Sequence, residues 1–248
     1  MVESLMKHIG IVGTSSEGAA LCYVTICQEA AKSLGNYRHP VVTLYTASLE
    51  DYMKHFIDDD NIDWESASAV LADSVDKLKT IGADFTICSD NGMHHSLDLI
   101  RDNLALPCLH ICEVTVQEAK ARGMEKLLIL GARCTMKGTV YQRVLDMEDM
   151  DYVTPNEEEI LELDRVIWEE LFTGRIEESS VAYYQQVIQK YKEQGCDGVI
   201  LGCTELPLLL NDKNSPLPCL DSTRLLARAA ISIALSDDPI NFMNASKF

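Results

Sequence analysis

Two segments of this chain align with each other without a gap, and the residue before the last in each can transfer a proton. They are residues 82–91 and 195–204, and both begin with glycine, continue as a short apolar run and then become polar. At the same position the first segment carries Asp90 and the second carries Cys203. A carboxylate and a thiol can each take or give a proton. The repeat therefore predicts a site between two halves of the chain, with one acid/base group on each face of the substrate.

Apolar runs alternate with segments of helical periodicity, which favours parallel sheets. We expect strands at 8–12, 41–45, 85–88, 107–111, 126–130, 198–201 and 217–220. We expect helices at 19–34, 64–81, 114–122, 157–171, 179–194 and 222–235. In open α/β sheets ligands bind beyond the carboxyl ends of strands, where both repeats become polar. The pattern predicts a duplicated α/β unit, with residues 1–113 plus 217–248 in the first half and 114–216 in the second.

Composition and charge narrow the class of protein. The chain has 248 residues and a formal net charge of −18 at pH 7, which argues against nucleic acids and anionic membranes as partners. No apolar run is long enough to cross a bilayer, and the N-terminal residues do not suit a signal peptide. The nine cysteines show neither a CxxC pair nor the spacing of a zinc site. We therefore expect a reduced, cytoplasmic protein that binds a small molecule and no metal.

Cys203 is the first candidate catalytic residue, in the segment Gly202-Cys203-Thr204-Glu205. A thiol at a strand end before a helix faces backbone N–H groups and the positive helix terminus, which favour the thiolate. Thr204 would cap that helix and Glu205 would lie in its first turn. The alternative interpretation is a small, buried and chemically inert cysteine.

Asp90 is the second candidate, and its alternative interpretation is strong. Aspartate is a favoured helix cap, and Asp90-Asn91-Gly92 suits a tight turn. The alignment with Cys203 favours the catalytic interpretation, in which Asn91 and Gly92 offer an amide and a backbone N–H to a substrate carboxylate. His94 and His95 are adjacent and point about 100° apart on a helix, so they cannot act as a pair.

Two further loops follow predicted strands. Ser15 and Ser16 lie in a turn that could bind an anion, but it lacks the glycine pattern and the lysine of nucleotide-binding loops. In the equivalent loop of the second half, Arg133 is the one cation that we can place at a strand end. Arg133 could hold a carboxylate of the substrate, or it could face solvent.

Taken together, these motifs resemble the aspartate/glutamate racemase superfamily, whose members use no pyridoxal phosphate. The resemblance spans nearly the whole chain, and the intact Gly-Cys-Thr-Glu element at 202–205 is its most specific part. The other matching motifs are Gly13-Thr14-Ser15, Asp90-Asn91-Gly92-Met93-His94, residues 131–136 with Tyr141-Gln142, and Asp221-Ser222-Thr223. The resemblance implies two pseudo-symmetric three-layer α/β/α units with parallel four-stranded sheets, an active site in the cleft between them, a homodimer and no cofactor.

One departure from the family pattern bears on the mechanism. Asp90 stands where the family has its first cysteine, and Gly92 stands in place of a threonine. A symmetric enzyme with two thiols is therefore ruled out, and the resemblance assigns catalysis to Asp90 and Cys203. The substrate-binding residues that we predict are Ser15, Ser16, Asn91, Gly92, Arg133, Cys134, Thr135, Thr204 and Glu205.

The two predicted proton-transfer groups are unequal. Reference pKa values of about 3.9 for aspartate and 8.5 for cysteine differ by roughly 6 kcal/mol of proton affinity. We expect Cys203 to act as the thiolate base on one face of an aspartate- or glutamate-type amino acid, and protonated Asp90 to act as the acid on the other. Two alternatives remain open. One is a lyase or cis–trans isomerase of the same fold that acts through Cys203 on a malonate- or maleate-like diacid, and the other is an inactive amino-acid-binding homologue.

Overall fold

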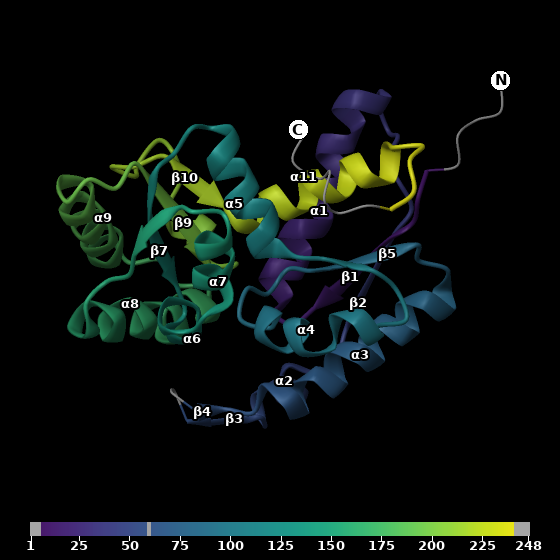
Figure 1. Cartoon of the computed structure of the whole chain (residues 1–248), viewed down its shortest axis with the longest axis horizontal. Coiled ribbons are helices and arrows are strands. Elements are labelled where there is room, and N and C mark those ends of the chain that lie inside the picture. The colour runs from purple at the N-terminus through teal and green to yellow at the C-terminus, as the bar shows by residue number, and fades with distance from the viewer. Residues whose placement is uncertain (1–5, 59–60, 241–248) are drawn as a thin grey trace. The chain divides into compact units, whose positions relative to one another are not determined.

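The computed structural model describes residues 6–58 and 61–240, which form two compact α/β units (Figure 1). The first unit consists of the residues up to Val114 together with those from Thr223 onward, and the second is the continuous segment Thr115–Ser222. Each unit contains its own parallel four-stranded sheet. The predicted α/β fold with two such sheets is confirmed.

The sheet of the first unit has the strand order β2-β1-β5-β6. β1 (Ile9–Gly13) lies between β2 (Val42–Thr46) and β5 (Phe85–Cys88), and β6 (Cys108–Leu109) pairs with β5. Every residue of β1 and β5 is buried, because the central strands of a parallel sheet are covered on both faces. After β1 the chain first forms β2 on one side of β1 and later forms β5 on the other side.

Helices of the first unit connect these strands, and the C-terminal helix belongs to the same unit. The elements are α1 (Ser16–Leu34), α2 (Leu49–Met53), α3 (Trp64–Ile81), α4 (His94–Ile100), the 3₁₀ turn Arg101–Asn103, the hairpin strands β3 (Phe56–Asp58) and β4 (Asn61–Ile62), and α11 (Ser222–Leu235). Arg228 of α11 donates to both carboxylate oxygens of Glu29 on α1, at 2.7 and 3.0 Å. The backbone N–H of Lys7 donates to the carbonyl of Ala234 at 3.0 Å. These contacts join the two ends of the chain within one unit.

The sheet of the second unit has the order β10-β9-β7-β8. Its strands are β7 (Lys126–Gly131), β8 (Asp151–Val153), β9 (Gly198–Gly202) and β10 (Cys219–Asp221). Its helices are α6 (Arg133–Lys137), α7 (Val140–Met147), α8 (Glu157–Glu169), the 3₁₀ turn Leu171–Thr173, α9 (Glu178–Glu193) and α10 (Leu206–Leu209). A further helix, α5 (Ile111–Ala121), runs from the last residues of the first unit into the second.

The predicted assignment of residues 217–220 to the first half is wrong. β10 pairs in parallel with β9, with Cys219 opposite Val199, and it completes the sheet of the second unit. The boundary therefore falls between Ser222 and Thr223, and not between 216 and 217. The strand order β8-β7-β9-β10 repeats β2-β1-β5-β6 of the first unit, so the duplication itself requires a fourth strand at this place.

An aspartate in each repeat ties two neighbouring strands together. In the first unit Asp84 accepts the backbone N–H of His8 at 2.6 Å, directly before β1. In the second unit Asp197 accepts the backbone N–H groups of Glu125 and Lys126, at 2.7 and 3.0 Å, where β7 starts. A carboxylate that accepts backbone N–H groups at this point fixes the register of the strand pair. The repeated Gly-x-Asp pattern is therefore structural, and it aligns the strand ends that carry Asp90 and Cys203.

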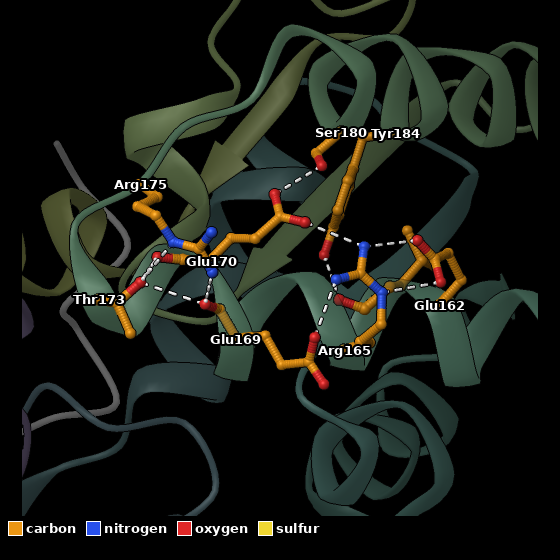
Figure 2. A network of polar contacts seen from close by, with 9 residues as sticks. Glu162, Arg165, Glu169, Glu170, Thr173, Arg175, Ser180 and Tyr184 are labelled. Carbon is orange, nitrogen blue, oxygen red and sulfur yellow. Dashed lines mark hydrogen bonds and ion pairs between the residues drawn. The ribbon is translucent and has the colours of Figure 1, made fainter.

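A network of charged residues fastens α8 to the segment that follows it (Figure 2). Arg165 donates to Glu162, Glu169 and Glu170, with N–O distances between 2.7 and 3.1 Å. Glu170 is buried, and its other oxygen accepts the hydroxyl of Ser180 at 2.6 Å. A buried carboxylate is tolerated when each of its oxygens is paired in this way. The network belongs to the scaffold of the second unit.

Among the helices of the described ranges, none has the length and apolar character needed to cross a bilayer. All nine cysteines lie within these ranges and carry thiols. Residues 6–58 and 61–240 contain no group of three histidine, cysteine, aspartate or glutamate side chains that could hold a metal ion.

Candidate active site

In each unit, the two central strands end at the same edge of the sheet, where the strand order changes direction. In the first unit these are β1 and β5, and in the second they are β7 and β9. Ligands of open parallel sheets bind at this point. Asp90 lies just beyond β5, and Cys203 directly follows β9. Each predicted proton-transfer group is therefore at the binding edge of its own unit.

Asp90 is held by hydrogen-bond donors on both of its carboxylate oxygens. The Thr14 hydroxyl, just beyond β1, donates to Oδ2 at 2.8 Å, and the backbone N–H of Met93 donates to Oδ1 at 3.0 Å. The Met93 contact closes the tight turn that we predicted as the structural alternative to a catalytic role for Asp90. The Thr14 contact crosses from one central strand end to the other. Asp90 is thus both a turn residue and a side chain presented at the binding edge, where it is partly exposed.

His94 fixes the backbone of the Asp90 turn. Its Nε2 accepts the backbone N–H of Ile111 at 3.1 Å, so its proton is on Nδ1, which lies 2.8 Å from the Asp90 carbonyl oxygen. His94 is fully buried against His110, and burial, together with His110, holds its pKa well below the usual value. A neutral histidine with both nitrogens engaged supports the turn. His95 stacks on Trp64 with ring centroids 4.8 Å apart.

The other predicted contacts of the first unit lie on the same two loops. The Ser15 hydroxyl accepts the backbone N–H of Gly18 at 3.3 Å and caps α1. Ser16 is exposed and donates to the neighbouring Glu17. Asn91 and Gly92 are buried in the turn after Asp90. The fold brings Ser15, Asn91 and Gly92 to the binding edge of this unit, and their contact with a substrate stays a prediction.

Cys203 meets a hydrogen-bond acceptor. The residue is 8% exposed, and its thiol donates to Oε2 of Glu205 at 3.0 Å. The Thr204 hydroxyl donates to the same oxygen at 2.7 Å, and the Glu205 side chain is completely buried. Two donors therefore converge on one carboxylate oxygen beside the thiol.

The predicted cap at Thr204 is wrong. The helix that follows is α10, which has only four residues and begins at Leu206, so Glu205 is not in its first turn but precedes it. No side chain caps this helix, because the Thr204 hydroxyl is used by Glu205. A single turn carries little helix dipole. The chemical partner of the thiol is therefore the Glu205 carboxylate and not a helix terminus.

The glycine before Cys203 is required by the close approach of two strands. Gly131 and Gly202 are opposite each other in the β7–β9 pair. A Cβ added to Gly131 would lie 2.6 Å from the Gly202 carbonyl oxygen, and one added to Gly202 would lie 2.8 Å from the Leu130 carbonyl oxygen. Thr135 packs against both glycines, since either added Cβ would meet its Cγ2 at 3.0 Å. Thr135, a predicted binding residue, is thus placed beside the strand end that carries the thiol.

Arg133 is buried, so the alternative of a solvent-facing arginine is wrong. Its residue exposure is 9%. Nη2 donates to Oε1 of Glu157 at 2.7 Å, and the backbone N–H donates to Oδ1 of Asp164 at 2.6 Å. Lys137 contacts the same Glu157 oxygen at 3.3 Å. Cys134, the next predicted binding residue, is partly exposed.

Other thiols are poor candidates for catalysis. Cys88 precedes Asp90 by two residues, but burial and the Asp90 charge raise its pKa well above the ordinary value. Burial raises the pKa of Cys108 and of Cys219 to about 11. A thiol that stays protonated is neither a base nor a nucleophile.

The sequence does not mark two residues of this region as site residues. Thr14 lies in a predicted loop, and its contact with Asp90 depends on β1 and β5 being neighbours. Glu157 begins a predicted helix, and it pairs with Arg133 from 24 residues away. The polar residues after the first predicted strand indicate that Thr14 could belong to a site. Nothing in the sequence near Glu157 indicates that it pairs with Arg133.

Comparison with known proteins identifies the family. The family model of the Asp/Glu/Hydantoin racemases matches residues 9–230. The chain therefore belongs to this family, as the motifs predicted. The members named below carry amino-acid racemase names, and the family model is that of racemases, so the predicted isomerase class is confirmed at the level of the family.

Three relatives show how far the likeness extends. The broad specificity amino-acid racemase RacX of Bacillus subtilis (strain 168) is 27% identical over 220 residues, which cover 86% of this chain and 90% of that protein. The solved structure of a Yersinia pestis protein assigned to the Asp/Glu racemases is 33% identical, with a TM-score of 0.84 over 93% of this chain and 100% of that one. An aspartate racemase homologue from Pyrococcus horikoshii OT3 is 28% identical, with a TM-score of 0.79 over the same shares.

Proposed function

We propose that this protein is a cofactor-independent amino-acid racemase that moves a proton between Cys203 and Asp90 on opposite faces of the α-carbon. The observation that carries the proposal is the matched pair of strand ends. Each presents one proton-transfer group with a polar partner, Thr14 for Asp90 and Glu205 for Cys203. The relatives named as racemases, one of them of broad specificity, support the same reaction.

Cys203 must lose a proton before it can take one from the substrate. In the resting thiol, S–H donates to Oε2 of Glu205. Transfer of this proton breaks the S–H bond and forms an O–H bond, leaving a thiolate beside a neutral carboxylic acid. The pair carries one negative charge before and after the transfer. The thiolate then removes the α-proton from one face of the amino acid, and the electron pair stays on the α-carbon.

Asp90 delivers the second proton through Oδ2. We assign the proton to Oδ2, because its partner is a hydroxyl that can donate or accept, whereas the partner of Oδ1 is a backbone N–H that can only donate. A carboxylate oxygen has two acceptor directions. Thr14 occupies one of them, and the other holds the proton that goes to the α-carbon. When the reaction runs from the opposite enantiomer, Asp90 is the base and Cys203 returns the proton.

The carbanion between the two transfers needs hydrogen-bond donors, because no cofactor spreads its charge. Asn91, Thr135 and the backbone N–H groups of the loops are the donors that we assign, because the Thr204 hydroxyl already donates to Glu205. Ser15, Ser16, Gly92 and Cys134 remain predicted substrate contacts. The predicted homodimer and cytoplasmic location also stay predictions.

Deuterium exchange at the α-carbon tests this proposal. Wild type, Cys203→Ser and Asp90→Asn are incubated in deuterated buffer with each enantiomer of a panel of amino acids, and products are separated by chiral chromatography. Asparagine keeps the Met93 contact but cannot transfer a proton, and its amide nitrogen replaces the oxygen that accepts from Thr14. We expect racemisation with deuterium uptake in wild type and loss of racemisation in both variants.

Three other outcomes would contradict this proposal, and each would indicate a different role for Asp90 or a different function of the protein. If Asp90→Asn racemised at the wild-type rate, Asp90 would not be a catalytic residue. Release of CO2 from a malonate-like diacid with protonation on one face would identify the lyase. Tight amino-acid binding without exchange would identify an inactive homologue.

A further inference from the structure

Charged side chains gather at the end of β7. Arg133 and Lys137 both contact Oε1 of Glu157, at 2.7 and 3.3 Å. Asp164 accepts the backbone N–H of Arg133 at 2.6 Å. Two cations therefore share the Glu157 carboxylate, and a second carboxylate, Asp164, binds the backbone of Arg133. Arg133 is buried, whereas Glu157 is more than half exposed. The carboxylate that pairs with the buried guanidinium therefore lies closer to solvent than the guanidinium does.

This set of charges lies at the binding edge of the second unit. Arg133 begins α6 directly after β7, Glu157 begins α8 after β8, and Cys203 follows β9. The three strands are neighbours in one parallel sheet, so their carboxyl ends meet at the same edge. A substrate bound beside Cys203 would therefore lie at the sheet edge that carries Arg133.

We propose that Glu157 is a specificity-determining residue: by pairing with Arg133 it cancels the cation that would hold a second carboxylate, and the site prefers amino acids with neutral side chains over aspartate and glutamate. This inference rests on the proposed racemase function and replaces the aspartate- or glutamate-type substrate expected from the sequence.

The argument is electrostatic. A substrate carboxylate that leaves water must be compensated by a partner of opposite charge. Any carboxylate that Arg133 bound would also lie within a few ångströms of Glu157, so the repulsion would offset most of the attraction. The hydrogen bond from Lys137 and, to a smaller extent, the one from Arg133 lower the pKa of Glu157. Glu157 is therefore ionised at neutral pH. The net charge of −18 makes the surrounding field unfavourable for a second anion.

Glu157 also lies in the first turn of α8, where an acid stabilises a helix N-terminus. Glu158 is an exposed acid in the same turn and provides a matched control. The capping box between Asn156 and Glu159 is untouched by a change at either position. Glu157→Gln and Glu158→Gln thus remove the same charge from the same helix end, and only the first removes the partner of Arg133.

The test compares isosteric substrates that differ in charge. Racemisation of asparagine against aspartate, and of glutamine against glutamate, is measured as kcat/KM for wild type, Glu157→Gln and Glu158→Gln. We expect wild type to prefer the amides at least tenfold. Glu157→Gln should raise the acid-to-amide ratio at least tenfold, and Glu158→Gln should leave this ratio within twofold of wild type.

The outcomes separate this inference from the function beneath it. A wild-type enzyme that racemises aspartate or glutamate as fast as the amide would overturn the inference alone. An acid-to-amide ratio that does not rise in Glu157→Gln, or that rises equally in Glu158→Gln, would do the same. Absence of α-proton exchange with every amino acid would overturn the racemase function and the inference with it.

Discussion

The strand ends after β5 and β9 have the same place in the two sheets but opposite surroundings. Asp90 is surrounded by donors, because the Thr14 hydroxyl and the Met93 N–H both point at its carboxylate. Cys203 is next to an acceptor, because its thiol donates to Glu205. The two units share a strand order and the aspartates that set their register. The duplicated scaffold thus positions two groups, and the local partners adapt each group to its chemistry.

The difference matches what each group requires as a base. A carboxylate is already ionised at neutral pH and needs donors that orient it, whereas a thiol must first lose its proton. A donor beside Cys203 would leave that proton without a destination. The contrast between the two strand ends therefore leads to four experiments.

Cys203→Ser should cause the largest loss. A serine hydroxyl is a far weaker acid than a thiol, so Glu205 cannot deprotonate it, and we expect kcat to fall at least about 10³-fold in both directions of racemisation. Chiral chromatography with either pure enantiomer measures the loss. Cys27→Ser, at a partly exposed position on α1, is the control and should keep activity within about twofold of wild type. Equal activity of the two variants would remove Cys203 from the mechanism.

Glu205→Gln should reduce kcat about 10²-fold near pH 7, since the amide cannot accept the thiol proton. The thiolate would then form only by loss of its proton to solvent. We therefore expect the activity of the variant to rise with pH through the ordinary range of a thiol, about 8–9. A pH–rate profile from 6 to 10 compares the variant with wild type. A variant profile parallel to that of wild type would show that Glu205 does not take the proton.

Thr14→Val should lower kcat by about tenfold, because a hydrogen bond to a charged group is worth about 1.5–3 kcal/mol and valine keeps the shape of threonine without the hydroxyl. Thr14→Ser keeps the hydroxyl and should restore most of the activity. The comparison is made with both enantiomers at saturating substrate. Similar rates for the valine and serine variants would mean that Oδ2 of Asp90 needs no orienting donor.

His94 should affect stability and its dependence on pH. Its pKa in the folded protein is well below the ordinary value, so below about pH 6.5 the unfolded chain binds a proton that the folded chain does not. The free energy of unfolding should therefore fall as the pH falls, by up to about 1.4 kcal/mol per pH unit from this residue.

Denaturant unfolding at pH 5.5, 6.5 and 7.5 measures this contribution. His94→Gln should be less stable than wild type at pH 7.5 and should lose less stability on acidification. His95→Gln changes a partly exposed ring stacked on Trp64 and should keep the wild-type dependence. If all three proteins lost stability equally between pH 6.5 and 5.5, His94 would not be the buried neutral group described here.

Much of the scaffold could be predicted because long elements carry their own signals. The helix over 64–81, the strand over 85–88 and the helix over 222–235 have the predicted bounds. Gly82 ends its helix in the left-handed region, with φ of 100°. Short elements contain too few residues to show a helical or strand-like pattern of apolar side chains. β8 has three residues, α10 has four and α6 has five, and neighbours in space decide their conformation.

The candidate site was predictable in its chemical groups but not in their partners. Asp90 and Cys203 emerged from the internal repeat, which is visible in the sequence. The partner of Asp90 depends on strand order, and the partner of Cys203 depends on the helix being one turn long, which freed Thr204 to bind Glu205. The pairing of Arg133 with Glu157 joins two elements across the sheet edge, and no local pattern encodes it.

The split first unit also orders events during synthesis. The second unit is one continuous segment, so its sheet is complete in sequence once Ser222 has been translated. The first unit has all four of its strands long before that point but lacks α11, whose end binds Lys7 and whose Arg228 binds Glu29. We therefore expect the second unit to be able to fold during translation, before the first unit receives its contacts from α11. Truncation before α11 would leave the strand end carrying Asp90 in an unfinished unit, while the strand end carrying Cys203 would lie in a finished one.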